Sequence, residues 1–204
     1  MVPPFGVFTT GKKINTVKDL RGLRIRTPGP TVGLALAKLG AIPLGMPVSM
    51  IGDAIASGTV EAIAFSMDST LGTKGAGDKY LHEQLSVVVD MRFAAPSQMV
   101  VMSQAKWDAL PAEFQAAIEK GTVGFIGDGL RVREEAEISG LKKFQADPRY
   151  TVIPFSRQLR EELRTAMAPA FDDWKADMTR RGLGGDRLLS HAQELVRQFS
   201  VASN

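Results

Sequence analysis

Two arginines lie two positions apart in a short segment whose residue types could bind an anion. Arg24 and Arg26 alternate with apolar residues, and a Pro-Gly-Pro turn at positions 28–30 follows directly. This alternation is typical of a strand with one buried face, so both guanidinium groups are expected on the same side. Ligands of open α/β sheets bind beyond the carboxyl ends of strands, where a guanidinium can donate paired hydrogen bonds to a carboxylate. Composition alone favours a solvated or edge face instead, whereas the position favours a carboxylate site.

Catalytic chemistry has little support in the sequence. His82 and His191 lie far apart without metal-ligand spacing, so each is expected to be a lone surface side chain. Neither a G-x-S-x-G nucleophile motif nor a P-loop motif occurs, and the paired carboxylates lie on segments expected to be exposed helix faces. The chain has no cysteine, which excludes disulfides, thiolate zinc sites and a cysteine nucleophile. We therefore expect no catalytic residue, no metal, no cofactor and no enzymatic activity.

Strand-length and helix-length segments alternate along the chain. Strands are expected at residues 23–27, 42–46, 60–65, 86–91, 98–102 and 150–154. Helices are expected at residues 17–21, 31–39, 49–57, 111–146, 156–167, 170–181 and 186–199, with a further short helix after Ser103. Thr16 and Asp19 have the spacing of a capping box at the first helix. This alternation predicts an α/β fold, with a parallel or mixed sheet of about five strands covered by helices on both faces.

The segment 111–146 is expected to be an unusually long helix, although it contains four glycines. Each glycine inside a helix costs about 1 kcal/mol relative to alanine. Their presence predicts a bend, a break or close packing against another backbone. The glycines are Gly121, Gly124, Gly127 and Gly129.

Composition restricts the class of protein. Apolar residues make up 44% and charged residues 23% of the 204 residues, as in a soluble globular protein. The net charge is +3 without a basic stripe or a set of stacking aromatic residues, so nucleic-acid binding is not expected. No apolar run is long enough to span a bilayer, and no signal peptide is recognisable. Either the mature form is cytosolic or the true N-terminus is missing.

Four blocks of sequence resemble the DctP-type solute receptors, which are the substrate-binding proteins of TRAP (tripartite ATP-independent periplasmic) transporters. Residues 17–28 read VKDLRGLRIRTP and resemble the family segment DLKGLKIRxP. Residues 39–47 read LGAIPLGMP and resemble LGAxPxxMP, and residues 54–62 read AIASGTVEA and resemble ALQxGxVDG. Residues 107–115 read WDALPAEFQ and resemble WxxLPxxxQ. The blocks occur in the family's order and at its spacing.

The resemblance implies a periplasmic-binding-protein-like fold of two α/β lobes joined by crossing strands and a long hinge-spanning helix. On that template, residues 13–97 and 147–180 form the second, ligand-binding lobe. Residues 98–146 form a crossing strand and the long helix of the hinge, and residues 181–204 form a C-terminal helix and tail. Most of the first lobe is then expected to be missing from this chain.

The resemblance also implies a binding site. It places the family's carboxylate-clamping arginine at Arg26. Residues 61–66 read EAIAFS where many members read DGQENP, so the ligand-contacting asparagine of the sialic-acid-type receptors is Phe65 here. This departure argues against a polar sugar acid, and Phe65, Met67 and Phe93 suit a smaller or more apolar acid. Ordinary core packing is the alternative for Phe65 and Phe93.

The leading functional hypothesis is a periplasmic transport receptor that captures a small organic carboxylate and delivers it to membrane subunits. The alternative is a ligand-sensing effector domain of a cytosolic regulator with a similar lobe. An enzyme on an α/β scaffold is a third class, which the missing catalytic residues disfavour. Without its first lobe, the chain is expected to self-associate through the exposed lobe interface.

Overall fold

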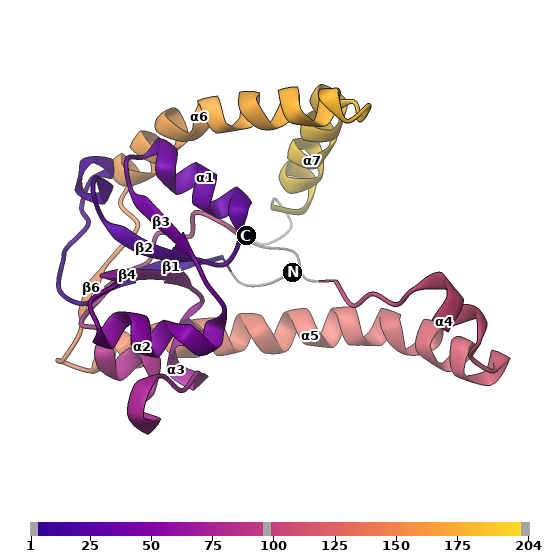
Figure 1. Cartoon of the computed structure of the whole chain (residues 1–204), viewed down its shortest axis with the longest axis horizontal. Helices are drawn as coiled ribbons and strands as arrows, with labels where there is room; N and C mark the ends of the chain where they lie inside the picture. Colours follow the sequence, from indigo (N-terminus) through magenta and orange to yellow (C-terminus); the bar gives the residue numbers. More distant parts are fainter. Residues whose placement is uncertain (1–3, 96–98, 201–204) are drawn as a thin grey trace.

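A six-stranded mixed sheet lies at one end of the molecule, on the left in Figure 1, and helices pack on both of its faces. The structure is a computed structural model and describes residues 4–95 and 99–200. The strands lie in the order β3-β2-β4-β1-β5-β6, and β1 is antiparallel to both of its neighbours while the other pairs are parallel. Their bounds are Gly6–Thr9 (β1), Arg24–Thr27 (β2), Ile42–Gly45 (β3), Ala62–Phe65 (β4), Val87–Val89 (β5) and Thr151–Ile153 (β6). The predicted α/β class with a mixed sheet is therefore confirmed.

Helices cover both faces of this sheet, with α1 and α6 on one face and α2, α3 and part of α5 on the other (Figure 1). The α-helices are α1 (Pro30–Lys38), α2 (Ile51–Ala56), α3 (Met67–Gly72), α4 (Gln104–Asp108), α5 (Ala112–Ala146), α6 (Arg157–Arg180) and α7 (Gly185–Ser200). Short 3-10 helices lie at Val17–Leu20 (η1), Val48–Met50 (η2), Ala76–Asp78 (η3) and Leu81–Gln84 (η4). The capping box at η1 is present as predicted, since Asp19 accepts a hydrogen bond from Thr16 N at 2.9 Å.

The apolar residues of the central strands alternate between two cores, one on each face. In β4, Ala62 and Ala64 belong to the core under α1 and α6, whereas Ile63 belongs to the core under α2 and α5. In β1, Val7 belongs to the core under α1 and α6, and Phe8 belongs to the core under α2 and α5. Successive side chains of a strand point to opposite faces, so a strand buried on both faces reads as a continuous apolar run.

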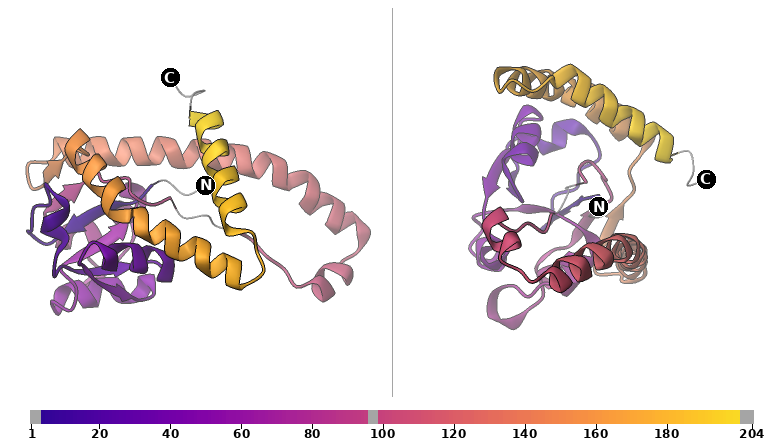
Figure 2. Two further views of the ribbon diagram at one scale, coloured as in Figure 1. Left: turned by 90° about the horizontal axis from the view of Figure 1, so that it is seen from above. Right: turned by 90° about the vertical axis from the view of Figure 1, so that its right-hand side faces the viewer.

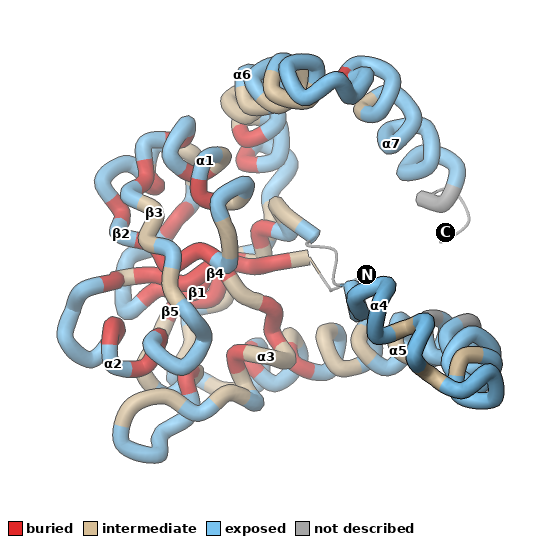
Figure 3. The backbone as a smooth tube through the Cα atoms, turned by 45° about the vertical axis from the view of Figure 1, so that its right-hand side comes forward, coloured by how far each residue is buried: buried red, intermediate tan, exposed pale blue. Residues whose placement is uncertain are grey.

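The long helix α5 is attached to the sheet through its C-terminal half only. Phe144 is 1% exposed and packs against Phe8 and Tyr150, with ring centroids at 5.6 and 4.9 Å. The N-terminal half projects beyond the sheet (Figure 2), and its surface is largely exposed (Figure 3). Phe125, in this projecting half, is 71% exposed.

The four glycines predicted to bend, break or closely pack this helix do none of these within the described residues. The helix runs without interruption from Ala112 to Ala146. A Cβ atom built at any of the four positions would meet nothing within 4 Å. The glycines lie in the projecting half, where the described part of the chain supplies no neighbour.

Three details of the expected element pattern are wrong. Residues 99–102 form no strand, and Gln98 lies outside the described residues. Val100 is 96% exposed, and a strand needs a hydrogen-bonded neighbour that this segment lacks among the described residues. The two helices expected at 156–167 and 170–181 are a single helix, α6, with Pro169 inside it. The central strand β1 was not predicted.

Candidate functional site

Arg26 lies on β2 near the carboxyl end of the parallel part of the sheet. It is in register with Leu44 of β3 and Ile63 of β4, and its side chain is buried, with 3% of the residue exposed. The backbone carbonyl of Met46 accepts hydrogen bonds from Arg26 Nε at 3.2 Å and Nη2 at 3.1 Å. A bifurcated contact of this kind holds the guanidinium in one orientation. The acceptor is a backbone carbonyl, so the pattern of residue types in the sequence could not have predicted this contact.

Arg26 carries a buried charge without a counter-ion in the described part of the chain. Its Nη1 atom is shielded from solvent and makes no hydrogen bond there. Burial lowers the pKa of Arg26 from its usual value, because desolvation disfavours the charged form. A buried guanidinium is costly unless an anion pairs with it. Within the described residues, the guanidinium therefore has an unpaired donor and no counter-ion.

Arg24 behaves differently, although it lies only two residues earlier. It is exposed, and its Nε forms an ion pair with Glu61 Oε2 at 3.2 Å. That hydrogen bond is the main cause that lowers the pKa of Glu61. Of the two arginines, only Arg26 combines burial with an unused donor.

A groove of about 660 Å³ lies beside Arg26, at the carboxyl ends of β2 and β3. Its walls are mostly apolar, and Leu34, Pro43, Pro47 and Val48 are among them. Arg26 is the one charged residue in the lining formed by the described residues. Such a groove suits a ligand with one negative charge and an apolar body.

The first turn of α1 adds to the positive potential of the groove. Gly29 is the N-cap residue, without a capping side chain, and Pro30 occupies the first position of the helix. Both residues line the groove. The first backbone N–H groups of a helix have no partner inside the helix, and the helix dipole makes this end positive. An anion beside Arg26 would therefore also lie near this helix terminus.

Phe65 is the predicted ligand residue that the structure brings together with Arg26. Its ring centroid lies 5.4 Å from Arg26 Cζ, within the range of a cation–π interaction, and 6.2 Å from the ring of Phe5. Met67 is 1% exposed and lies in the core under α2 and α5, and Phe93 is partly buried against the opposite core. Phe65, Met67 and Phe93 are not among the residues that line the groove.

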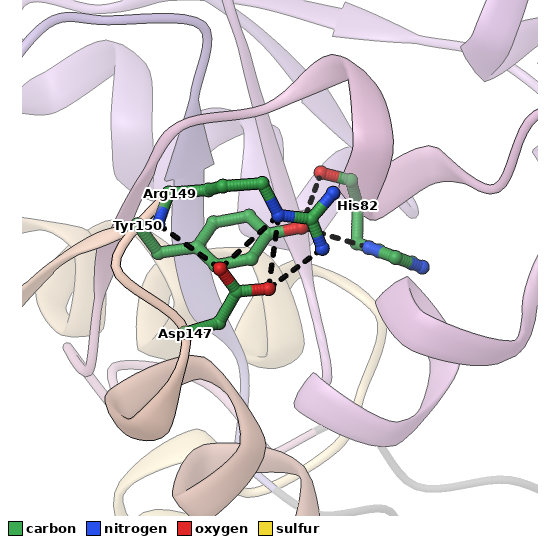
Figure 4. A network of polar contacts seen from close by, with 4 residues as sticks. All are labelled: His82, Asp147, Arg149 and Tyr150. Carbon is green, nitrogen blue, oxygen red and sulfur yellow. Dashed lines mark hydrogen bonds and ion pairs between the residues drawn. The ribbon is translucent and has the colours of Figure 1, made fainter.

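His82 is half-buried and bonded, so its prediction as a lone surface histidine is wrong. Its Nδ1 lies 2.8 Å from the hydroxyl of Tyr150, which also donates to the His82 carbonyl at 3.1 Å (Figure 4). Arg149 lies over the Tyr150 ring and binds both carboxylate oxygens of Asp147. Burial lowers the pKa of His82. This network joins η4 to the turn before β6, and no described group of three or more His, Asp or Glu side chains has the arrangement of a metal site.

Comparisons with known proteins agree with this architecture. The structure of a TRAP solute binding protein from Rhodoferax ferrireducens T118, in complex with copurified benzoate, superposes with a TM-score of 0.75 at 27% identity. The match covers 98% of this chain and 62% of that protein. A TRAP periplasmic solute binding protein from Desulfovibrio salexigens with bound orotic acid shares the fold, with a TM-score of 0.79, 20% identity and coverage of 95% and 60%.

A third structure, from a marine metagenome, is a TRAP solute binding protein specific for aromatic acid ligands, in complex with metahydroxyphenylacetate. Its TM-score is 0.77 at 22% identity, and the match covers 96% of this chain and 61% of that one. This chain therefore spans about three-fifths of the length of these proteins. In the part of the chain that the structure describes, no helix is both long and apolar enough to cross a membrane.

The family model for bacterial extracellular solute-binding proteins of family 7, named DctP, matches residues 5–177. This match spans most of the chain and confirms the family resemblance that the four sequence blocks indicated. The matched proteins are solute-binding proteins of transporters and not enzymes. The chain belongs to family 7 of the bacterial extracellular solute-binding proteins, the DctP family.

Proposed function

We propose that the chain binds a small organic carboxylate in the groove beside Arg26. The observation that carries this proposal is the buried guanidinium, which has no counter-ion and one unused nitrogen donor among the described residues. Because Met46 engages the Nε side and Nη1 is shielded in this structure, we propose that a small movement of the groove wall brings the end formed by Nη1 and Nη2 to the ligand. Two parallel hydrogen bonds from this end match the two oxygens of a carboxylate.

We infer further that the ligand is a monocarboxylate with an apolar body. The groove offers one cation, and its other named walls are apolar or backbone. A second carboxylate would lose its hydration without finding a partner there. The proteins bound to benzoate and to metahydroxyphenylacetate show that the same fold can hold acids of this kind. This supports aromatic or similarly apolar acids as the first compounds to examine.

In its transporter, this chain is proposed to act as a periplasmic receptor that delivers the acid to membrane subunits. We propose that the sheet and its helices, residues 13–97 and 147–180 together with β1, form the ligand-binding lobe. Residues 98–146 are proposed to contribute the hinge, and residues 181–204 a C-terminal extension. The family match and the attachment of α5 through its C-terminal half support this division.

A titration of the chain with benzoate, followed by nuclear magnetic resonance (NMR), tests the binding proposal. We expect saturable shifts of the backbone amides of Thr31 and Val32, which lie at the open first turn of α1. Because the groove is open on one side, the affinity in this chain is expected to be no tighter than millimolar. Uniform small shifts without saturation would reject the groove as the site.

Substitution of Phe65 tests the apolar character of the site. Phe65→Leu keeps an apolar side chain but removes the ring beside Arg26, and should weaken benzoate binding by about 0.5–2 kcal/mol. Phe65 does not line the groove itself, so this prediction supposes that the bound acid reaches past Arg26 to position 65. Phe65→Asn should then weaken benzoate further and improve the relative affinity for hydroxylated acids, because an amide can bond hydroxyl groups. The measurement is the ratio of dissociation constants for benzoate and gluconate. An unchanged ratio in Phe65→Asn would show that Phe65 does not select the ligand.

We also propose that the isolated chain self-associates. Apolar side chains are exposed on residues 99–102 and on the projecting half of α5, where Phe114 and Phe125 lie. Exposed apolar surface of this kind favours association. Multi-angle light scattering should give a mass above that of the monomer, which the double substitution Phe114→Ser and Phe125→Ser should lower. A monomer at every concentration would contradict this expectation.

A further inference from the structure

One face of α5 is attached to the turn that follows β4. Arg133, Glu137, Gly140 and Phe144 recur at spacings of four and three residues, so they lie on the same side of the helix. Arg133 Nη1 lies 3.8 Å from Asp68 Oδ2. A Cβ atom at Gly140 would lie 3.0 Å from the Cβ atom of Met67, which shows how closely the two helices approach.

Glu137 makes the direct polar contact between α5 and this turn. Its Oε2 atom accepts hydrogen bonds from the backbone N–H groups of Met67 at 2.8 Å and Asp68 at 3.3 Å. These are donors of the first turn of α3, which a helix leaves without internal partners. The carboxylate of one helix therefore caps the start of another that is distant in sequence.

The capped turn leads directly to the proposed ligand site. Phe65 is the last residue of β4, and Ser66 follows it as the N-cap of α3. Ser66 is buried, its carbonyl accepts a hydrogen bond from Thr70 Oγ1 at 2.8 Å, and its Oγ donates to Asp68 Oδ1 at 2.5 Å. These hydrogen bonds connect the residues of the turn, and its first member, Phe65, carries the ring that contacts Arg26.

Glu137 is poorly suited to a purely stabilising role. Burial is the largest influence and raises the pKa of Glu137, although the two backbone donors act in the opposite direction. A carboxyl group with a raised folded-state pKa lowers the unfolding free energy as the pH rises through that pKa. A glutamine could cap the same donors without burying a charge, so a charged residue here is costly for stability alone.

Other charged groups share the surroundings of Glu137. A cavity of about 540 Å³ between the sheet and α5 is lined by Glu137 and by further charged residues. Asp68 and Asp90 also raise the pKa of Glu137 through their negative charge. Besides Glu137, the charged residues that line this cavity are Asp90, Arg92, Arg133, Glu134 and Lys142.

We propose that Glu137 is a positioning residue, which holds the turn carrying Phe65 against α5 and thereby couples occupation of the Arg26 groove to the attachment of the long helix. The inference rests on the proposed carboxylate site. The contacts run from Glu137 to the Met67 amide, then through Phe65 to the guanidinium of Arg26. Coupling between two sites is reciprocal, so ligand in the groove must also strengthen the attachment of α5.

The test compares Glu137→Ala and Glu137→Gln with Glu134→Ala, an exposed position on the same helix that lines the same cavity. Without ligand, the Met67 and Asp68 amides should exchange hydrogen about tenfold faster or more in Glu137→Ala, since hydrogen bonds to a charged acceptor are lost. Glu134→Ala should leave both exchange rates unchanged. Equal rates in Glu137→Ala and Glu134→Ala would show that Glu137 does not hold the turn.

Benzoate is then added to the same proteins. In the wild-type chain it should slow the exchange of the Met67 and Asp68 amides, and Glu137→Ala should lose this effect and bind benzoate about 3–10-fold more weakly. Glu137→Gln should bind more weakly than wild type but more tightly than Glu137→Ala, because its neutral amide oxygen accepts weaker hydrogen bonds than a charged carboxylate. The benzoate affinity of the wild-type chain should fall as the pH is lowered within the range in which benzoate stays ionised. The benzoate affinity of Glu137→Gln should not change over the same range. Circular dichroism confirms that each variant is folded.

The outcomes separate the two proposals. A wild-type chain that does not bind benzoate rejects the proposed site and the coupling with it. A wild-type chain that binds, together with a Glu137→Ala variant that binds equally well and shows the same ligand-induced slowing, overturns the coupling and leaves the site intact. If Glu137→Ala does not fold, the pH dependence of benzoate affinity is compared between Glu137→Gln and wild type. Equal slopes in the two proteins would overturn the inference.

Discussion

Arg26→Ala is expected to abolish the weak benzoate binding of this chain; where a second lobe also encloses the groove, the expected loss is about 2–5 kcal/mol, the usual cost of removing one partner of a buried charge pair. Arg26 is 3% exposed and has no anionic partner among the described residues, so a bound carboxylate would be its counter-ion. The substitution also removes Nη1, the nitrogen donor of Arg26 that has no partner among the described residues. In an NMR titration, saturation should disappear from the accessible range of benzoate concentrations.

Three further substitutions sharpen this prediction. Arg26→Lys should restore binding only in part, because an ammonium group lacks the paired planar donors. Arg26→Met should abolish binding and yet raise the unfolding free energy of the ligand-free chain, since replacing a buried ion by an apolar side chain is often stabilising. Arg24→Ala is the control, because Arg24 is exposed and pairs with Glu61. Unchanged benzoate affinity in Arg26→Ala would move the site elsewhere.

Phe144→Ala is expected to lower the unfolding free energy of the chain by about 3–5 kcal/mol, as for other large-to-small substitutions of a buried phenylalanine. Phe144 is 1% exposed, and its ring contacts those of Phe8 and Tyr150. The cavity left behind would open between the sheet and α5. Urea unfolding monitored by circular dichroism gives the difference.

Phe125→Ala on the same helix is the matched control. Its side chain is 71% exposed, so the change should stay within about 0.5 kcal/mol of wild type. Comparable losses in the two variants would mean that the projecting half of α5 is packed in solution as firmly as the attached half. In that case the self-association proposed above would have to bury Phe125.

Local signals in the sequence predicted much of the sheet and its helices. The alternation around Arg26, the Pro-Gly-Pro turn and the capping box of Thr16 and Asp19 each act within a few residues, and the structure contains the predicted elements at all three places. Strand β4 was recognisable because burial on both faces makes its sequence a continuous apolar run.

Non-local partners explain the errors. Residues 99–102 are as apolar as a strand, but a strand also needs a neighbour, and the pattern of one segment cannot show whether that neighbour is present. Strand β1 has only four residues, and its place in the sheet depends on partners far along the chain. Two helices were expected at residues 156–167 and 170–181, whereas α6 continues through Pro169 between them.

The candidate site was only partly predictable from the sequence. Arg26 stood out because it is an arginine near the end of an alternating segment, directly before the Pro-Gly-Pro turn. The Met46 carbonyl gave no signal, because every residue has one. Glu137 was indistinguishable from the other acidic residues of a long helix, since only the packing of α5 against α3 reveals that its carboxylate faces two backbone donors.

Strand β1 determines the order in which the molecule can fold. Val7 pairs with Ala64 on one side and with Val89 on the other, so both partners of β1 lie far along the chain from it. Until β5 pairs, β1 has an unpaired edge, and contacts between residues distant in sequence form slowly. During this interval the apolar segment around Val7 is exposed to association with other chains. The strands β5 and β6 can therefore join the rest of the sheet only through β1.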